Sequence, residues 1–266
     1  MPICEVEIAE EFGWDEERLG KVMSVFFWGY AITQIPGGAA ADIFGGATTI
    51  CFSMFMWGTI CWATPMLVLT TREFLGNSMA YAVLFGLRIL MGLAQAIHFP
   101  SLSSILSRKM NDSGRAFAMS FVCCGSQFGT LLTGYFGSKL LEVTNWKTVF
   151  VFSGVLGVTF SVFMFYLNKN TYKNRHRVIN LGNLEDAPLM GVKNMGGTKL
   201  QSKHNFKSVV AQISTAVVET FELSRQLMKN KSFLALVAVH MSNTNSIFIL
   251  SFWLPKYSAF KKKQLK

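Results

Sequence analysis

Charged residues are scarce in this sequence, and long stretches contain almost none. Only 15% of the 266 residues are Asp, Glu, Lys or Arg, whereas 51% are hydrophobic and 24 are Phe. Soluble domains usually carry about 25% charged residues. The positive mean hydropathy of +0.34 is an average over very apolar segments and quite polar ones. This composition argues against an ordinary soluble domain and favours a membrane protein.

Motifs for covalent or metal chemistry are also missing. The sequence has no nucleophile elbow, no HExxH and no phosphate-binding loop. Its five cysteines include no CxxC pair, and four of them lie within apolar segments, where they are predicted to be small core residues. We therefore expect neither an enzyme nor a protein with a metal or other cofactor.

Six apolar segments are each long enough to cross a bilayer, which takes about 20 residues. They are residues 20–41, 48–69, 79–106, 116–141, 148–167 and 232–254. These segments predict an all-α, polytopic membrane protein. The net charge of +10 would suggest nucleic acid as the partner of a soluble chain. Here the bases lie between the apolar segments, as in cytoplasmic loops, so we expect a lipid bilayer and no nucleic acid as partner.

One long hydrophilic region, residues 168–231, holds eleven bases and four acids. Its first half is predicted to lack fixed structure. Residues 208–228 are less polar and are predicted to form an amphipathic helix on the membrane surface. This region and the basic connection at 107–115 are two spans apart, so both are predicted on the cytoplasmic face. The acidic N-terminus is then expected on the opposite face.

Arg88 lies well inside the apolar segment 79–106. A charge at bilayer depth costs roughly 2.5–3.5 kcal/mol on insertion scales, so such residues usually face a polar cavity. Helical spacing puts Gly92, Gln95 and Phe99 on the same face as Arg88. This pattern predicts a cavity arginine that meets an anionic substrate. The alternative is an arginine paired with an acid between two helices, although no predicted span contains an acid away from its ends.

The segment 116–141 carries polar residues at membrane depth, among them Ser126, Gln127 and Thr130. Such residues either line a substrate path or form hydrogen bonds between helices, and the sequence leaves both open. Gly125 and Gly129 have the GxxxG spacing that permits close helix contact in lipid.

Several motifs together resemble one family. The turn at 37–46, with Gly38, Asp42 and Gly45, is similar to the loop signature of the major facilitator superfamily. Within it, the chain resembles the anion/cation symporter family of vesicular glutamate, sialic acid, phosphate and nucleotide transporters, and most of all the nucleotide branch. The segments that carry this likeness are residues 26–38, 88–100, 125–134, 145–150 and 253–255.

The resemblance implies part of a twelve-helix fold, from helix two to helix seven, in a chain that looks truncated at both ends. It divides the sequence into an incomplete N-terminal half (1–167), a basic cytosolic loop (168–231), the first helix of the second half (232–255) and an atypical basic tail (256–266).

The resemblance also assigns roles. It implies alternating access, with Gly38, Asp42 and Gly45 as a conformational loop motif whose charge contacts are weakened, because Ile43 and Thr48 stand where bases are usual. The substrate-binding residues that we expect are Arg88, Gln95, Phe99, Ser126, Gln127 and Thr130.

Two positions bear on the substrate. Gln95 stands where the glutamate and sialic acid branches have an acid, and Met23 where glutamate transporters have a histidine. A glutamine cannot carry a proton, so the resemblance implies transport of nucleotides or other phosphate-bearing anions driven by membrane potential, in a vesicular, lysosomal or plasma membrane. The alternatives are a phosphate or organic-anion symporter, and a truncated isoform that does not transport and pairs with the full-length transporter.

Overall fold

The computed structural model describes residues 2–182, 206–230, 233–235 and 237–239. Its regular elements are all helical within those ranges. The elements are η1 (Pro2–Cys4), α1 (Glu5–Phe12), α2 (Glu16–Phe44), α3 (Gly46–Leu75), α4 (Asn77–Ala96), α5 (His98–Lys109), α6 (Asp112–Val143), α7 (Trp146–Gly182) and α8 (Phe206–Leu227). The prediction of an all-α protein is confirmed.

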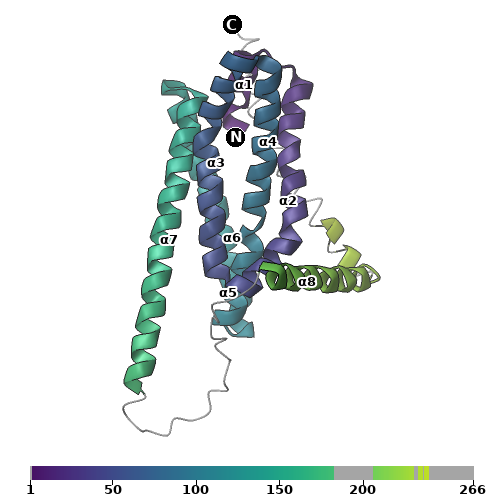
Figure 1. Ribbon diagram of the computed structural model, residues 1–266, viewed down its shortest axis with the longest axis vertical. Coiled ribbons are helices and arrows are strands. Elements are labelled where there is room, and N and C mark those ends of the chain that lie inside the picture. The colour runs from purple at the N-terminus through teal and green to yellow at the C-terminus, as the bar shows by residue number, and fades with distance from the viewer. Residues whose placement is uncertain (1, 183–205, 231–232, 236, 240–266) are drawn as a thin grey trace.

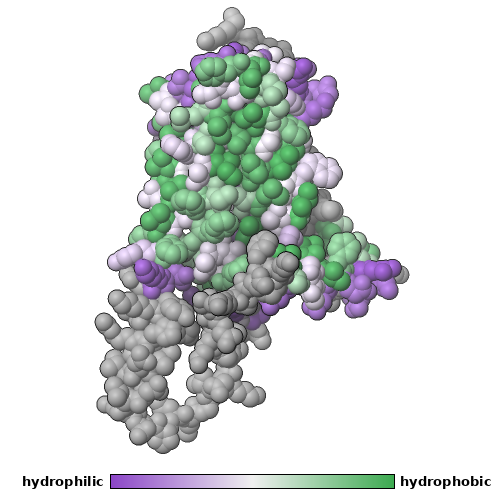
Figure 2. All heavy atoms as spheres, viewed as in Figure 1, coloured by the Kyte–Doolittle hydropathy of each residue, from purple (hydrophilic) through white to green (hydrophobic). Residues whose placement is uncertain are grey.

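The long helices α2, α3, α4, α6 and α7 run alongside one another, and α8 lies across their lower end (Figure 1). The most extensive contacts join α3 to α7, α2 to α4 and α3 to α4. Hydrophobic side chains cover the middle of the bundle, and hydrophilic ones gather towards its two ends (Figure 2). This banded surface is what a bilayer requires of the helices that cross it.

Four helical segments in the described part of the chain are long and apolar enough to span a membrane. They are Gly46–Leu75, Asn77–Lys109, Gly114–Val143 and Trp146–Lys169, and they confirm four of the six predicted spans. Helix α2 covers the predicted span 20–41 but is not one of these four segments; it contains Thr33, Gln34 and Pro36 among its hydrophobic residues. Most of the sixth predicted span, 232–254, lies outside the described residues.

The apolar segment 79–106 forms two helices rather than one. α4 ends at Ala96 and α5 begins at His98, with Ile97 between them. Pro100 explains the break, because a proline has no N–H to continue the hydrogen-bond ladder and is tolerated in the first turn of a helix.

The hydrophilic region is more helical than the sequence predicts. Helix α7 continues to Gly182, so the prediction that this part lacks structure is wrong for residues 168–182, and the predicted boundary at 167 falls inside a helix. No Gly or Pro occurs between 168 and 181, and an existing helix extends easily because each added residue adds a hydrogen bond. Helix α8 confirms the helix predicted at 208–228. Residues 183–205 and the predicted tail 256–266 lie outside the described ranges.

Small residues allow several helix pairs to approach closely, and α2–α4 and α3–α7 are two of them. A Cβ on Gly92 of α4 would collide with the backbone of α2 at Phe26, and one on Gly154 of α7 would lie 2.5 Å from the Trp62 nitrogen of α3. Gly125 and Gly129 of α6 differ, because a Cβ there would meet nothing within 4 Å. The close helix contact that their spacing predicts is therefore absent from the described part of the chain.

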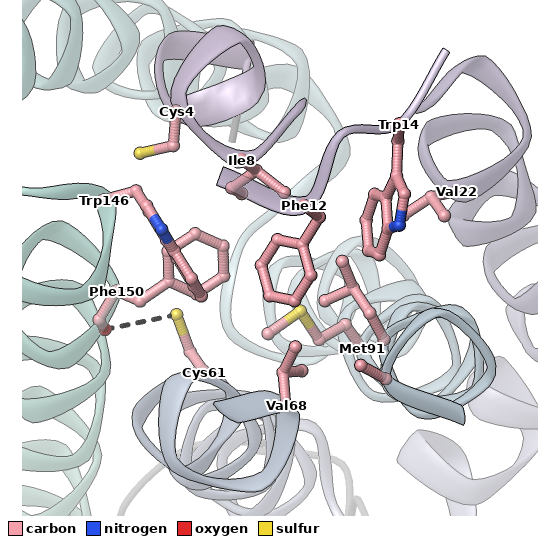
Figure 3. Close-up of a cluster of buried hydrophobic side chains, with 12 residues drawn as sticks. Cys4, Ile8, Phe12, Trp14, Val22, Cys61, Val68, Met91, Trp146 and Phe150 are labelled. Carbon is pink, nitrogen blue, oxygen red and sulfur yellow. Dashed lines mark hydrogen bonds between the residues drawn. The ribbon is translucent and has the colours of Figure 1, made fainter. Parts of the chain in front are cut away.

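A buried hydrophobic cluster fills the end of the bundle where α1 and the N-terminus of the chain lie (Figure 3). Phe12 of α1 stacks on Trp14, with ring centres 4.7 Å apart, and also approaches Trp146 of α7 at 6.2 Å. The other cluster residues labelled in Figure 3 are Cys4, Ile8, Val22, Cys61, Val68, Met91 and Phe150. The short helix α1 thus forms a cap over α3, α4 and α7.

Candidate functional site

Arg88 lies on α4 and is only 5% exposed. Its Cζ is 5.8 Å from the centre of the Phe150 ring of α7, and its Nη1 is 3.9 Å from the sulfur of Met91. Among the residues that the structure describes, no group accepts a hydrogen bond from its Nε or Nη2. The described residues provide no carboxylate within ion-pair distance, so the alternative of an acid-paired arginine gains no support from them.

Arg88 is therefore a buried cation with unused donors. A guanidinium has five N–H donors in a fixed plane, and a buried donor without an acceptor costs about 1–3 kcal/mol. Its neighbours Met91 and Phe150 belong to the cluster beneath α1 (Figure 3). An anion that reached this position would satisfy the free donors. Arg88 is thus a buried cation whose donors are not all satisfied by the described part of the chain.

Polar contacts fasten the α1 cap above this site. The Glu11 carboxylate accepts hydrogen bonds from Trp146 Nε1 at 2.5 Å and Lys147 Nζ at 2.9 Å, and Arg72 Nη1 lies 3.9 Å away. Glu7 accepts a hydrogen bond from the backbone N–H of Trp146 at 2.9 Å. These contacts join α1 to α3 and α7.

The same contacts set the charge state of Glu11. Partial burial by itself raises the pKa of this carboxyl group. The hydrogen bonds from Lys147 and Trp146, together with the charges of Lys147 and Arg72, outweigh burial and bring its pKa below the ordinary value. Sequence reasoning missed this cluster, since Glu11 and its partner Trp146 are 135 residues apart and no motif links them.

The other residues on the predicted face of Arg88 have different surroundings. Gly92 packs against the backbone of α2. The space beside Gly92, which has no side chain, is filled by Phe26 and Tyr30 and is not part of a cavity. Gln95 is half-buried, and Phe99 is 40% exposed on α5, beyond the helix break. Of these four residues, Arg88 and Gly92 are buried, whereas Gln95 and Phe99 are more exposed.

Helix α6 exposes two different surfaces. Ser126, Gln127 and Thr130 form a polar side and are all exposed. Phe121, Phe128, Leu131 and Leu132 form an apolar side and are also exposed. The Thr130 hydroxyl donates to the Ser126 carbonyl of its own helix at 3.1 Å, and within the described chain none of the three polar residues bonds to another helix. Their polar groups therefore remain available to line a path.

The turn between α2 and α3 is fixed by α5. The Ser104 hydroxyl donates to Asp42 Oδ1 at 2.7 Å, and Arg108 Nη2 donates to the Asp42 carbonyl oxygen at 2.6 Å and lies 3.6 Å from Oδ1. Gly45 has a φ of +89°, which favours glycine. Gly38 approaches Pro100 of α5.

The weakened charge contacts predicted for this turn therefore need correction, because Arg108 supplies a positive charge from another helix. Sequence reasoning missed both Ser104 and Arg108. The basic end of the segment 79–106 was visible in the sequence, but its packing against the turn follows from the tertiary arrangement of α2, α3 and α5.

Comparison with known proteins agrees with this architecture. Residues 1–264 match the Major Facilitator Superfamily. The chain is 37% identical over 257 residues to the voltage-gated purine nucleotide uniporter SLC17A9 of Homo sapiens, a match that covers 97% of this chain and 51% of that protein. The chain thus spans about half the length of this relative.

Plant proteins are similar at lower identity. The probable chloroplastic anion transporter 4 of Oryza sativa subsp. japonica is 26% identical over 97% of this chain and 38% of its own length. The chloroplastic sodium-dependent phosphate transport protein 1 of Arabidopsis thaliana is 25% identical over 97% of this chain and 44% of its own length. With its membrane-length helices and a match along nearly its whole length, the chain belongs to the major facilitator superfamily of membrane transporters.

Proposed function

We propose that this chain forms part of a transporter that moves organic anions across a membrane, with purine nucleotides as the substrate class. The observation that carries this proposal is Arg88, a buried cation with two donor nitrogens that no group in the described part of the chain satisfies. The similarity to a purine nucleotide uniporter and to anion transporters supports the same substrate chemistry.

Phosphate oxygens suit Arg88 because a guanidinium binds them through two parallel, charge-assisted hydrogen bonds. The half-buried Gln95 and the partly exposed ring of Phe99 lie further along α4 and α5 and extend the path. Ser126, Gln127 and Thr130 offer hydroxyl and amide groups from α6. In this proposal Arg88 binds the phosphates, and the other residues contact the remainder of the substrate.

Alternating access requires that each end of the path opens in turn. In this structure the α1 cap covers the end near Arg88, where Glu11 joins it to α7. At the other end Asp42 and Arg108 hold the α2–α3 turn against α5. We infer that the cap moves to admit an anion to Arg88 and that the turn rearranges when the opposite end opens.

Membrane potential is the driving force that fits Gln95. A glutamine does not titrate, so this position cannot couple anion movement to protons. A nucleotide carries several negative charges, and each is worth about 2.3 kcal/mol per 100 mV. A compartment with a positive interior, such as a vesicle or lysosome, would therefore accumulate it, and the plasma membrane is the alternative location.

Uptake into proteoliposomes tests the proposal. The purified chain is reconstituted, an interior-positive potential is imposed, and uptake of radiolabelled ATP is measured. We expect potential-dependent uptake that Arg88→Ala abolishes and that the exposed arginine variant Arg18→Ala retains. Excess inorganic phosphate tests the alternative of a phosphate symporter. Strong competition by phosphate against ATP uptake would favour that alternative. Uptake that is indifferent to Arg88→Ala would refute the role of this residue.

A further inference from the structure

Helix α8 differs from the spanning helices in position and composition. It runs across the lower end of the bundle instead of along it, and it contacts α2 (Figure 1). Its 22 residues are amphipathic and include Lys207, Glu219, Glu222 and Arg225. It is not one of the segments apolar enough to cross a membrane.

An apolar stripe on α8 is left exposed. Val210 and Phe221 are 48% and 68% exposed, and their spacing of eleven residues puts them on one side of the helix. Met228, which directly follows the end of α8 at Leu227, is 52% exposed. Val218 beside them is 66% exposed. Among the side chains of this helix that the structure describes, the half-buried ones are Ile213, Ala216 and Val217. The contact with α2 thus leaves much of the apolar surface uncovered.

Basic residues border this stripe. Arg225 is exposed and lies one helical turn after Phe221, and the exposed Lys229 adjoins Met228. Lys207 occupies the position one turn before Val210. Glu219, two residues before Phe221, falls on the opposite side of the helix. The exposed Glu222 lies one turn after Val218, on the same border as Arg225. Basic residues therefore outnumber acidic ones on this border, and Glu219 lies on the side away from it.

The end of the bundle beside α8 is also basic. Helix α5 ends at Arg108 and Lys109, and α5 and α8 lie at the same end of the molecule (Figure 1). Basic connections mark the cytoplasmic side of membrane proteins. The lipid leaflet on that side carries negative headgroups, which attract Lys and Arg close to the surface.

We propose that α8 docks on the anionic surface of the cytoplasmic leaflet. Phe221, Val210 and Met228 enter the boundary between headgroups and acyl chains, while Arg225 and Lys229 contact the headgroups. Amphipathic helices with large apolar residues on one side and bases beside them bind membranes in this way. Long basic side chains also reach headgroups while their stems cover apolar surface. Docking would fix the orientation of α8 against the end of α2.

Hydrogen–deuterium exchange of the whole chain in nanodiscs tests this docking. One preparation contains phosphatidylcholine alone, and the other contains phosphatidylcholine mixed with phosphatidylserine. We expect amides in Val210–Leu227 to exchange more slowly in the anionic nanodiscs. The double variant Arg225→Glu and Lys229→Glu should lose that difference. Each basic residue near an anionic surface strengthens binding about fivefold, and the variant removes both contributions.

Two further variants complete the test. Lys169→Gln removes an exposed base of α7 outside the stripe, and α8 should keep its lipid-dependent protection. Phe221→Ser should raise exchange in both kinds of nanodisc because it removes the apolar anchor. Equal protection of α8 in both lipids, unaffected by the charge reversals, would show that protein covers the stripe and would overturn the proposal. Rapid exchange of α8 in both lipids would overturn it as well.

Discussion

The guanidinium carbon of Arg88 on α4 lies 5.8 Å from the centre of the Phe150 ring on α7, so a permanent charge is held against an aromatic face inside the bundle. A cation–π contact contributes about 0.5–2 kcal/mol. The effective cost of burying an ion is several kcal/mol. The contact offsets only part of that cost, and Arg88 lowers the stability of this conformation of the protein.

Arg88→Met should therefore stabilise the folded chain while removing anion binding. Methionine has a similar length and leaves no donor unsatisfied, so we expect the free energy of unfolding to rise by about 1–3 kcal/mol. Thermal unfolding in detergent measures the change, and ATP should raise the melting temperature of the wild type alone. A lower melting temperature for Arg88→Met would show that Arg88 has a structural partner instead.

Gly92→Ala tests the contact between α2 and α4. The added Cβ would collide with the Phe26 carbonyl oxygen and lie 2.9 Å from the Tyr30 nitrogen, and both are backbone atoms that cannot move aside alone. Overpacking of this kind typically costs about 1–3 kcal/mol. Thermal unfolding should show this loss for Gly92→Ala.

Gly129→Ala is the matched control, because a Cβ at Gly129 meets nothing within 4 Å. It makes the same chemical change on a long apolar helix and should leave the melting temperature close to that of the wild type. Equal losses in the two variants would mean that the α2–α4 contact does not decide the effect, because Ala favours a helix more than Gly and propensity alone would lower the stability of neither variant.

The span prediction succeeded where composition alone decides the outcome. Apolar length identified Gly46–Leu75, Gly114–Val143 and Trp146–Lys169 as helices long and apolar enough to span a membrane, because crossing a bilayer requires about 20 apolar residues. The same criterion could not locate the break at Ile97 or the extension of α7 to Gly182. Those features depend on a single proline and on the ease with which a helix continues.

The candidate site was less predictable for a physical reason. Arg88 stood out because a lone charge in an apolar segment is costly. The identities of its neighbours, Phe150 and Met91, depend on how α4 meets α7 and on local helix geometry. Likewise, Glu11 is one acid among several near the N-terminus. Its contacts with Lys147 and Trp146 form only when the chain folds, so the sequence did not distinguish it from the other acids.

Glu11→Gln should loosen the α1 cap. The variant loses the charge that Lys147 and Arg72 stabilise, and a hydrogen bond to a charged group is worth about 1.5–3 kcal/mol. We expect a lower melting temperature at neutral pH and faster amide exchange in α1. Glu17→Gln is the control, since the Glu17 side chain is 74% exposed and its ion pair with Lys21 lies on the surface. A cap that is equally protected in both variants would contradict this role.

The effect of Glu11 should also depend on pH. Its pKa in the folded chain lies below the ordinary value of 4.5, so the unfolded chain takes up the proton first as the pH falls. The stabilisation is therefore present above pH 4.5 and is lost as the pH falls through the folded-state pKa. Melting temperatures of the wild type and Glu11→Gln should converge over that interval. A difference that stays constant from neutral to strongly acidic pH would exclude the carboxylate charge as its cause.

The two sides of α6 should differ in their access to water. Gln127 lies on the polar side and Phe128 on the apolar side, although both are exposed. In a background with Cys123→Ser and Cys124→Ser, we expect Gln127→Cys to react with a negatively charged methanethiosulfonate reagent in proteoliposomes. Phe128→Cys should react much more slowly, because a thiolate does not form readily in lipid and the charged reagent does not enter it. ATP should slow the reaction at position 127 if this side lines the substrate path. Equal rates at the two positions would mean that α6 does not separate a water-filled path from lipid, and the proposed roles of Ser126, Gln127 and Thr130 would then fail together.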